Sequence, residues 1–449
     1  MADVTSGIFL LVRIMFWGLA VLSLRKGRPG VIAYLCLVHL NVFSYTAQSV
    51  NAVSFENLVK VFMLPLFMLW RDRPLPKVPK DWKKASWLWM AVTVYACVAT
   101  AWSTYPLAGL KMTAYLISYA LLFLVFLRHW RSGSLNRQVI LISLWSGLAL
   151  AIVQSYILPN PFGLGDELDF AARFTSFCSP QSFGLFLVVH AAFLLCYADR
   201  DRMFWVSIVA SSVGVLMTGS RYAFLGMAVL LLGSFVFSKE GRVTHPALGR
   251  LPGKQVALGA ATILLMIGLA RTLPGNRLQE LLGSPSSSVQ SYEELGTVAF
   301  RFAVYEDAWE RIQEFSHATA LFGKGTSTSA DVKIDILPTF NEDTVDANRS
   351  MHNEFLRALY EWGVTGLVLL SGVFFTITWR IWRVGLSGNG GKLIPLVALL
   401  PSLWLSMLVE NTLSNPGEPA GTSIALILAF VAAVDWRKPP LSAEIGGQR

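Results

Sequence analysis

The sequence predicts an all-α, polytopic membrane protein, and both its composition and its hydropathy pattern favour this class. Of its 449 residues 54% are hydrophobic and only 14% are charged, and the mean hydropathy is +0.52. A soluble globular chain of this length does not reach such values. Roughly twelve or thirteen apolar stretches are long enough to cross a bilayer as helices. They begin near Gly7, Pro29, Asn57, Ser86, Ala108, Gln138, Gln181, Phe204, Tyr222, Gln255, Gly363, Leu393 and Thr422.

Connectors that are rich in lysine and arginine alternate along the chain with connectors that are not. The basic connectors are residues 25–28, 71–84, 128–137, 199–202, 239–254, 380–392 and 437–438. Because positive residues of short loops stay on the cytoplasmic side, every second connector is predicted to be cytoplasmic. With thirteen spans the N-terminus lies outside and the C-terminus inside. Arg13 interrupts the first apolar segment, so that segment either lies in the interface or pairs inside the bundle.

The remaining connectors are predicted to face outward, and one of them is far longer than a passive link needs to be. The chain accordingly divides into ten transmembrane helices (1–271), a long outward loop module (272–350), the last transmembrane helices (351–436) and a cytoplasmic tail (437–449). Within the loop, Phe300, Val304, Ala308, Ile312 and Phe315 recur at helical spacing. This predicts an amphipathic helix over 297–315, which the turn at 321–325 ends.

Three arginines and one histidine are predicted on the outward side of the membrane. Arg173 lies in an outward loop, Arg221 follows Thr218-Gly219-Ser220 at the head of a span, Arg301 lies on the amphipathic helix and His352 closes the long loop. Guanidinium groups bind diphosphate oxygens in pairs and stay charged, and an imidazole can accept the proton of a sugar hydroxyl. The set therefore suits a diphosphate-linked sugar substrate without a metal ion.

Each candidate also has a structural interpretation. Arg221 could reach lipid phosphate, Arg173 and Arg301 could form loop salt bridges, and His352 could mark only the start of a helix that Asn353 caps. The chain has neither a Cys-x-x-Cys nor a His-Glu-x-x-His spacing, so no metal site is predicted. Its net charge of +9 is spread over cytoplasmic loops without an aromatic platform, which indicates contact with anionic lipid and no nucleic acid.

One motif carries a family resemblance. His352-Asn353, followed after nine residues by Gly363 and after two more by Gly366, resembles the hallmark motif of the bacterial O-antigen ligase and O-antigen polymerase superfamily. Further pieces appear in the family's order: Arg173 ahead of Gly184, the Ser-Arg element at Arg221, and Arg301 before a Gly-x-Gly turn at 323–325. The resemblance covers roughly residues 173–366.

The resemblance implies a glycosyltransferase of the C-type architecture in the bacterial inner membrane, with its active site facing the periplasm and no cofactor. The donor would be a glycan on undecaprenyl diphosphate, and the acceptor a hydroxyl of a lipid-linked repeat or of the lipid A core. In an inverting reaction Arg221 and Arg301, with Arg173, would hold the diphosphate while His352 activates the acceptor. Asn353, Glu361, Gly363 and Gly366 would support them. Membrane lipids and a chain-length regulator are further expected partners.

Four functions remain open: two are enzymatic, one is transport and one is structural. A polymerase needs room for two lipid-linked substrates, which the additional arginine at 173 favours, whereas a ligase transfers the finished chain to the lipid A core. A transporter or flippase is a different class, but it needs charged or broken-helix sites at mid-membrane, and the polar residues here gather at the outer side. The last alternative is a structural partner in a polysaccharide assembly complex.

Overall fold

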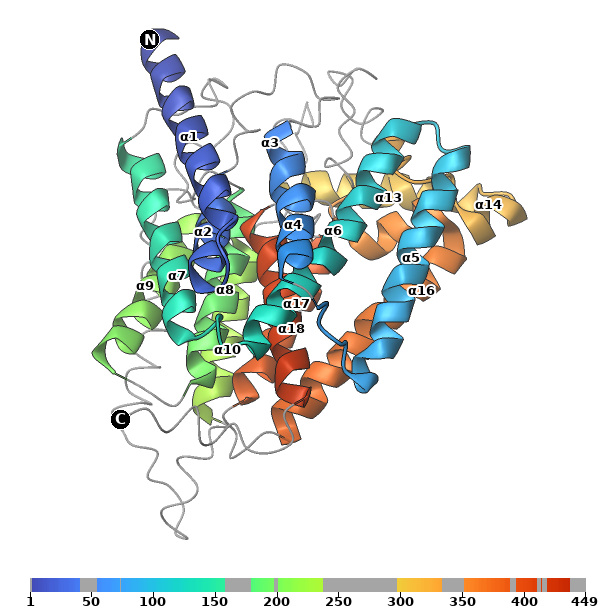
Figure 1. The fold of residues 1–449 in the computed structure, drawn as a ribbon. Helices are drawn as coiled ribbons and strands as arrows, with labels where there is room; N and C mark the ends of the chain where they lie inside the picture. Colours follow the sequence, from blue (N-terminus) through green and yellow to red (C-terminus); the bar gives the residue numbers. More distant parts are fainter. Residues whose placement is uncertain are drawn as a thin grey trace.

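The computed structural model describes residues 2–40, 55–72, 74–157, 179–197, 201–236, 297–332, 351–387, 393–409, 413 and 418–436. Within these residues the structure is helical and without strands, which confirms the predicted all-α class (Figure 1). The helices of the bundle are α1 (Ala2–Ser23), α2 (Arg28–Leu37), α3 (Phe55–Leu58), α4 (Leu64–Arg71), α5 (Lys83–Ala99), α6 (Pro106–Arg131), α7 (Arg137–Ile152), α8 (Pro180–Cys196), α9 (Arg202–Thr218), α10 (Arg221–Val236), α13 (Thr297–Gln313), α14 (His317–Phe322), α16 (Glu354–Ser387), α17 (Ile394–Val409) and α18 (Pro419–Trp436).

The helices agree closely with the apolar stretches of the sequence. Every predicted span start lies in or beside a helix except the one near Gln255, which falls outside the described residues. In the part of the chain that the structure describes, four helical stretches are long and apolar enough to cross a membrane, namely Lys80–Trp102, Pro106–Arg131, Arg137–Ser155 and Glu354–Leu386, and shorter apolar helices accompany them. The protein is therefore a polytopic helical membrane protein.

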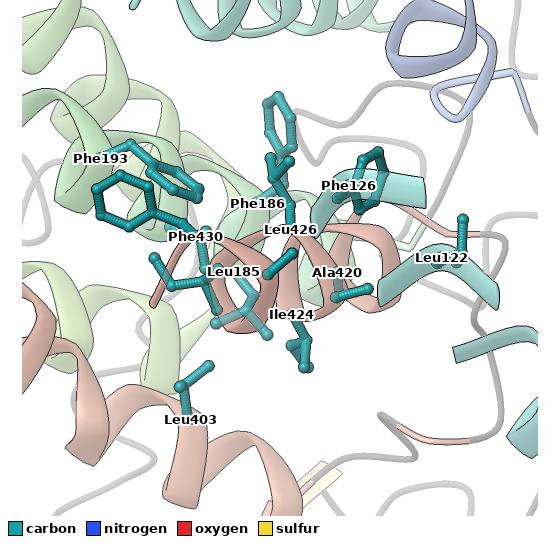
Figure 2. Close-up of a cluster of buried hydrophobic side chains, with 14 of the residues drawn as sticks. Leu122, Phe126, Leu185, Phe186, Phe193, Leu403, Ala420, Ile424, Leu426 and Phe430 are labelled. Atoms are coloured by element: carbon teal, nitrogen blue, oxygen red, sulfur yellow. The ribbon is translucent and has the colours of Figure 1, made fainter. Parts of the chain in front are cut away.

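An aromatic core lies where α6, α8 and α18 meet. Phe193 of α8 and Phe430 of α18 make an edge-to-face pair with ring centroids 5.3 Å apart, and Trp130 of α6 lies 5.6 Å and 4.9 Å from these rings. Figure 2 shows Phe193 and Phe430 with aliphatic side chains of α6, α8, α17 and α18 near them. Because lipid is as apolar as the core, such helices associate through close packing and through aromatic contacts.

Those basic connectors that the structure describes gather at one end of the bundle. Arginines there cross from one connector to another: Arg71 donates to the carbonyl of Leu24 at 2.7 Å, Arg128 donates to that of Pro74 at 2.5 Å, and Arg137 pairs with Asp201 at 2.5 Å. In Figure 1 the helices α13 and α14 lie near the opposite end from these connectors. The chain thus separates a basic end from an end that carries the long-loop module, as the charge alternation predicts.

Arg13 forms an ion pair, although its own side chain is 41% exposed. Its guanidinium lies 2.8 Å from the carboxylate of Glu56, which is about nine-tenths buried at the α3 helix. An ion pair of this kind lowers the cost of a charge in an apolar helix.

The predicted end of the amphipathic helix is wrong. The amphipathic helix ends at Gln313 and not at Phe315, and a second helix, α14, precedes the turn at 321–325. This second helix starts because the hydroxyl of Ser316 accepts the amide of Thr319 at 3.2 Å, which caps a new helical turn. The span predicted to start near Gly363 follows a kink at that residue, and a helical segment that begins at Glu354 precedes it.

Candidate functional site

His352 lies directly before α16, in a backbone conformation that residues with a β-carbon rarely adopt. Its φ is 52°, in the left-handed region. The next residue, Asn353, caps the helix: its side-chain oxygen accepts the amides of Phe355 at 3.1 Å and Leu356 at 3.0 Å. The predicted capping role of Asn353 is confirmed. The turn at His352 therefore leads from the long loop into a helix whose N-terminus is capped.

Tyr305 connects this turn to the helix that carries Arg301. Its hydroxyl lies 2.9 Å from the carbonyl oxygen of His352 and 3.2 Å from that of Leu408, near the end of α17. Arg301 lies four residues earlier on the same helix, α13, which is about one turn. A single side chain thus brings together α13, the head of α16 and the end of α17.

The start of α10, which is Arg221, lies at the same end of the bundle. The helices α10 and α17 run antiparallel in close contact, because Gly226 packs directly on Ser402 and Gly233 on Ala398. Extending this pairing places the first turn of α10 near the last turn of α17, where Leu408 meets Tyr305.

The start of α10 is also held to α8. The hydroxyl of Tyr222, one residue after Arg221, donates to the carbonyl of Gln181 in the first turn of α8 at 2.6 Å. The structure consequently gathers the backbone positions of Arg221, Arg301 and His352 at one end, whereas Arg173 lies outside the described residues.

Gly363 of the hallmark motif forms a kink in α16. Gly363 has φ 62° and ψ −166°, so the helix is broken there. The carbonyls just before a break lose their partners within the helix. Here the carbonyl of Tyr360 accepts the amide of Lys324 at 3.1 Å, that of Glu361 accepts the amide of Gly325 at 2.8 Å, and that of Trp362 accepts the hydroxyl of Tyr95 at 3.3 Å.

This arrangement explains why glycine stands on both sides of the contact. A β-carbon at Gly363 would lie 2.5 Å from the carbonyl of Leu321, and one at Gly323 would lie 2.2 Å from the carbonyl oxygen of Glu361. Gly366 leaves room for the side chain of Trp362, whose indole N–H donates to the hydroxyl of Thr326 at 3.0 Å. The Gly-x-Gly turn and Gly363 of α16 are two halves of one backbone contact.

A cluster of buried charged side chains lies on the first turns of α16, before the kink. Arg357 pairs with Glu354 at 2.5 Å, with side chains 2% and 0% exposed, and its guanidinium carbon lies 5.9 Å from the ring of Trp362. Glu354 also accepts the amide of Leu413 at 2.7 Å, and Glu361 accepts the hydroxyl of Ser329. The ionic cluster, defined as Glu354, Arg357 and Glu361, ties α16 to the 325–330 turn and to Leu413.

The sequence interpretation named Glu361 as a supporting residue but missed Glu354, Arg357 and Tyr305. Residues at positions i, i+3 and i+7 share one face of a helix, so the spacing of Glu354, Arg357 and Glu361 could have indicated an ion-paired face. No sequence pattern indicates the role of Tyr305, because its partners are backbone carbonyls 47 and 103 residues away.

Chemically, this end of the bundle brings one imidazole close to helices that carry two arginines. A guanidinium stabilises negative charge that develops on a phosphate leaving group, and a positioned base can remove a hydroxyl proton. The arrangement suits displacement of a diphosphate from a sugar by an acceptor hydroxyl.

Comparison with known proteins agrees with the motif. Residues 206–371 match the family model described as O-antigen ligase. The exopolysaccharide production protein ExoQ of Rhizobium meliloti (strain 1021) is 25% identical over 390 residues, which cover 78% of this chain and 77% of ExoQ. The predicted resemblance to the O-antigen ligase and polymerase superfamily is thereby confirmed. The matched segment contains Arg221, Arg301 and the whole motif from His352 to Gly366, whereas Arg173 precedes it.

Proposed function

Taking as premise that residues 206–371 are similar to the O-antigen ligase family, we propose that this membrane protein is a glycosyltransferase that polymerises a surface polysaccharide. The donor is a glycan on undecaprenyl diphosphate, and the acceptor is a sugar hydroxyl of a second lipid-linked repeat unit. The reaction takes place at the periplasmic face of the bacterial inner membrane.

The contact of Tyr305 with the carbonyl of His352 carries the proposal, because it joins the helix of Arg301 to the predicted base. His352 accepts the proton of the acceptor hydroxyl, whose oxygen attacks the anomeric carbon of the donor. The bond from that carbon to the diphosphate breaks, and the configuration at the carbon inverts. Arg221 and Arg301 hold the lipid diphosphate as its charge grows, and Arg173 is a further candidate for this role.

Polymerisation is favoured over ligation because the relative ExoQ is described as an exopolysaccharide production protein. Ligation of a finished chain to the lipid A core is the second candidate, since the matching family model is described as O-antigen ligase. The two reactions differ only in the acceptor, so the acceptor decides between them.

A reconstitution with defined lipids tests the proposal. Purified protein in lipid nanodiscs receives undecaprenyl-diphosphate-linked repeat units alone, and the products are separated by size. A ladder of longer glycans is expected. Products that form only after lipid A core is added would replace polymerisation by ligation, and the absence of products under both conditions would refute both.

The variant His352→Ala tests the assigned base in the same assay. Its rate should fall by about 100- to 10,000-fold, the usual contribution of a positioned general base, while the protein keeps its melting temperature. Asn353→Ala serves as the control, because it removes the helix cap and not the imidazole. It should lower the melting temperature with a smaller effect on rate.

A further inference from the structure

A polar cleft lies on the module formed by α13, α14 and the turn after them. Its volume is 490 Å³, and its walls include Asp307, Glu310, Arg311, Glu314, Phe315 and Lys324. Glu310 and Glu314 are exposed, so the cleft is open to solvent. The volume falls within the range of about 300–1,000 Å³ that small-molecule sites occupy.

The basic side chains of the cleft are held in place by neighbours. Lys324 lies 5.5 Å from the ring centre of Phe315 and 5.2 Å from that of Tyr360, and its ammonium donates to the Tyr360 hydroxyl at 3.3 Å. Arg311 pairs with Asp307 at 2.9 Å. Groups fixed in this way bind a ligand without a large loss of side-chain entropy.

The chemistry of the walls suits a ligand rich in hydroxyl groups. A carboxylate can accept hydrogen bonds from two hydroxyl groups, a guanidinium donates hydrogen bonds in pairs, and a half-buried aromatic ring offers an apolar surface. The walls carry three carboxylates, from Asp307, Glu310 and Glu314, against two basic groups, which disfavours an anionic ligand such as a diphosphate. An uncharged oligosaccharide fits the cleft best.

The position of the cleft relates it to the proposed reaction. Arg311 lies six residues after Tyr305 on α13, about 9 Å along the helix, and Tyr305 contacts the carbonyl of His352. Lys324 donates its amide to the carbonyl of Tyr360 just before the kink in α16. A glycan that reacts at His352 has its neighbouring sugar units within reach of this cleft.

We propose that the cleft is a glycan-binding subsite, which holds an oligosaccharide segment of the polysaccharide a few sugar units away from the reacting sugar. The proposal rests on the proposed function, because it is that reaction which brings a glycan to this end of the bundle. It adds the polar face of α13 and α14 to the substrate contacts.

Binding without turnover tests the subsite. The protein carries His352→Ala in lipid nanodiscs, and the probe is a fluorescently labelled oligosaccharide, made by partial hydrolysis of the surface polysaccharide of the bacterium that encodes the protein. Fluorescence anisotropy then gives the Kd. Glu314→Trp should fill the cleft and raise the Kd by about tenfold or more. The neighbouring Gln313→Trp is the matched control, since Gln313 is also exposed but does not line the cleft.

A second variant, Glu310→Ala, removes one exposed carboxylate without adding bulk and should also raise the Kd. Equal Kd values in all variants, or no binding of the oligosaccharides, would overturn the subsite even if polymer ladders form. Binding that Glu314→Trp abolishes supports the subsite even if no ladder forms, so its outcome is separate from that of the proposed reaction. An effect of Glu314→Trp on product length in cells, with unchanged Kd, would instead identify a protein-binding surface and refute the subsite.

Discussion

His352 is held in place by its neighbours and not by its own conformational preference. A left-handed backbone costs a residue with a β-carbon roughly 1–3 kcal/mol, and His352 has φ 52°. Tyr305 contacts its carbonyl from one side, and the cap at Asn353 begins a helix on the other. The direction of the imidazole therefore depends on residues that have no chemical part in the reaction.

Tyr305→Phe should separate positioning from chemistry. The variant keeps the ring but loses the hydroxyl contacts to His352 and Leu408, so the base is held less firmly. We expect kcat to fall by about 10- to 100-fold with little change in KM, because small misplacements of a catalytic group cost that much. Kinetics with lipid-linked repeat units measure both constants.

The control for this variant is Tyr34→Phe, which loses a buried hydroxyl contact to the carbonyl of Lys60 at 3.0 Å elsewhere in the bundle. The free energy of unfolding of Tyr34→Phe should drop by about as much as that of Tyr305→Phe, but kcat should not change. Equal kcat values for Tyr305→Phe and the original protein would rule out the positioning role.

Arg357 is expected to be among the residues on which stability depends most. Replacing it with methionine keeps much of its length but leaves two buried carboxylates, Glu354 and Glu361, without their shared cation. Loss of one partner of a buried ion pair costs about 3–5 kcal/mol, so thermal unfolding in detergent should occur at a clearly lower temperature. The double variant Glu354→Gln with Arg357→Met should recover part of this loss. A single variant as stable as the original protein would contradict the ion-paired role.

Among the elements, α16 differs from a simple membrane helix because it is kinked. The kink at Gly363 separates its first turns from its long remainder. The carbonyls that the kink exposes are used by the 323–325 turn and by Tyr95. The kink and the turn are thus formed together, and a change on either side disturbs both.

Gly363→Ala should destabilise the protein, because the new β-carbon meets the carbonyl of Leu321 and the backbone needs φ 62°. A strained position of this kind costs roughly 1–3 kcal/mol. Gly372→Ala in the same helix is the control, since its β-carbon would lie 3.8 Å from Leu88 in ordinary contact. That variant should be neutral or slightly stabilising, because alanine favours helices. Melting temperatures in detergent compare the two, and equal values would contradict the strained kink.

Elements differed in how well the sequence predicted them. Long apolar helices such as α6 and α7 were predictable because the bilayer imposes a length and a composition. The short helix α14 was not, since one hydroxyl cap at Ser316 determines where it begins. The motif predicted that Gly363 and Gly366 matter, but their reason, a close approach of the turn at 323–325, depends on contacts between distant segments of the chain. The same holds for Tyr305.

At the scale of the whole molecule, the described basic connectors lie at the opposite end of the bundle from Arg221, Arg301 and His352, as the charge alternation predicted. This agreement follows from topology, since an even number of crossings returns the chain to the same side. Loop charges alone therefore sufficed to group Arg221, Arg301 and His352, although they could not predict which side chains touch.

Cysteine labelling should reveal how the two ends are oriented in the membrane. In a protein whose native cysteines at positions 36, 97, 178 and 196 are replaced by serine, Glu314→Cys tests the module end and Ser132→Cys tests the basic end; both positions are exposed. A membrane-impermeant thiol reagent should label position 314 in spheroplasts and position 132 only after lysis. The reverse pattern would contradict a periplasmic active site.

The backbone contact between the Gly-x-Gly turn and the kink in α16 has a consequence for how such a protein can diversify. Hydrogen bonds between main-chain amides and carbonyls hold the turn against α16. Most side chains on the outer face of α13 and α14 can therefore change without weakening this contact. A lineage could then adapt this face to a differently built sugar chain while its attachment to the membrane helices stays the same.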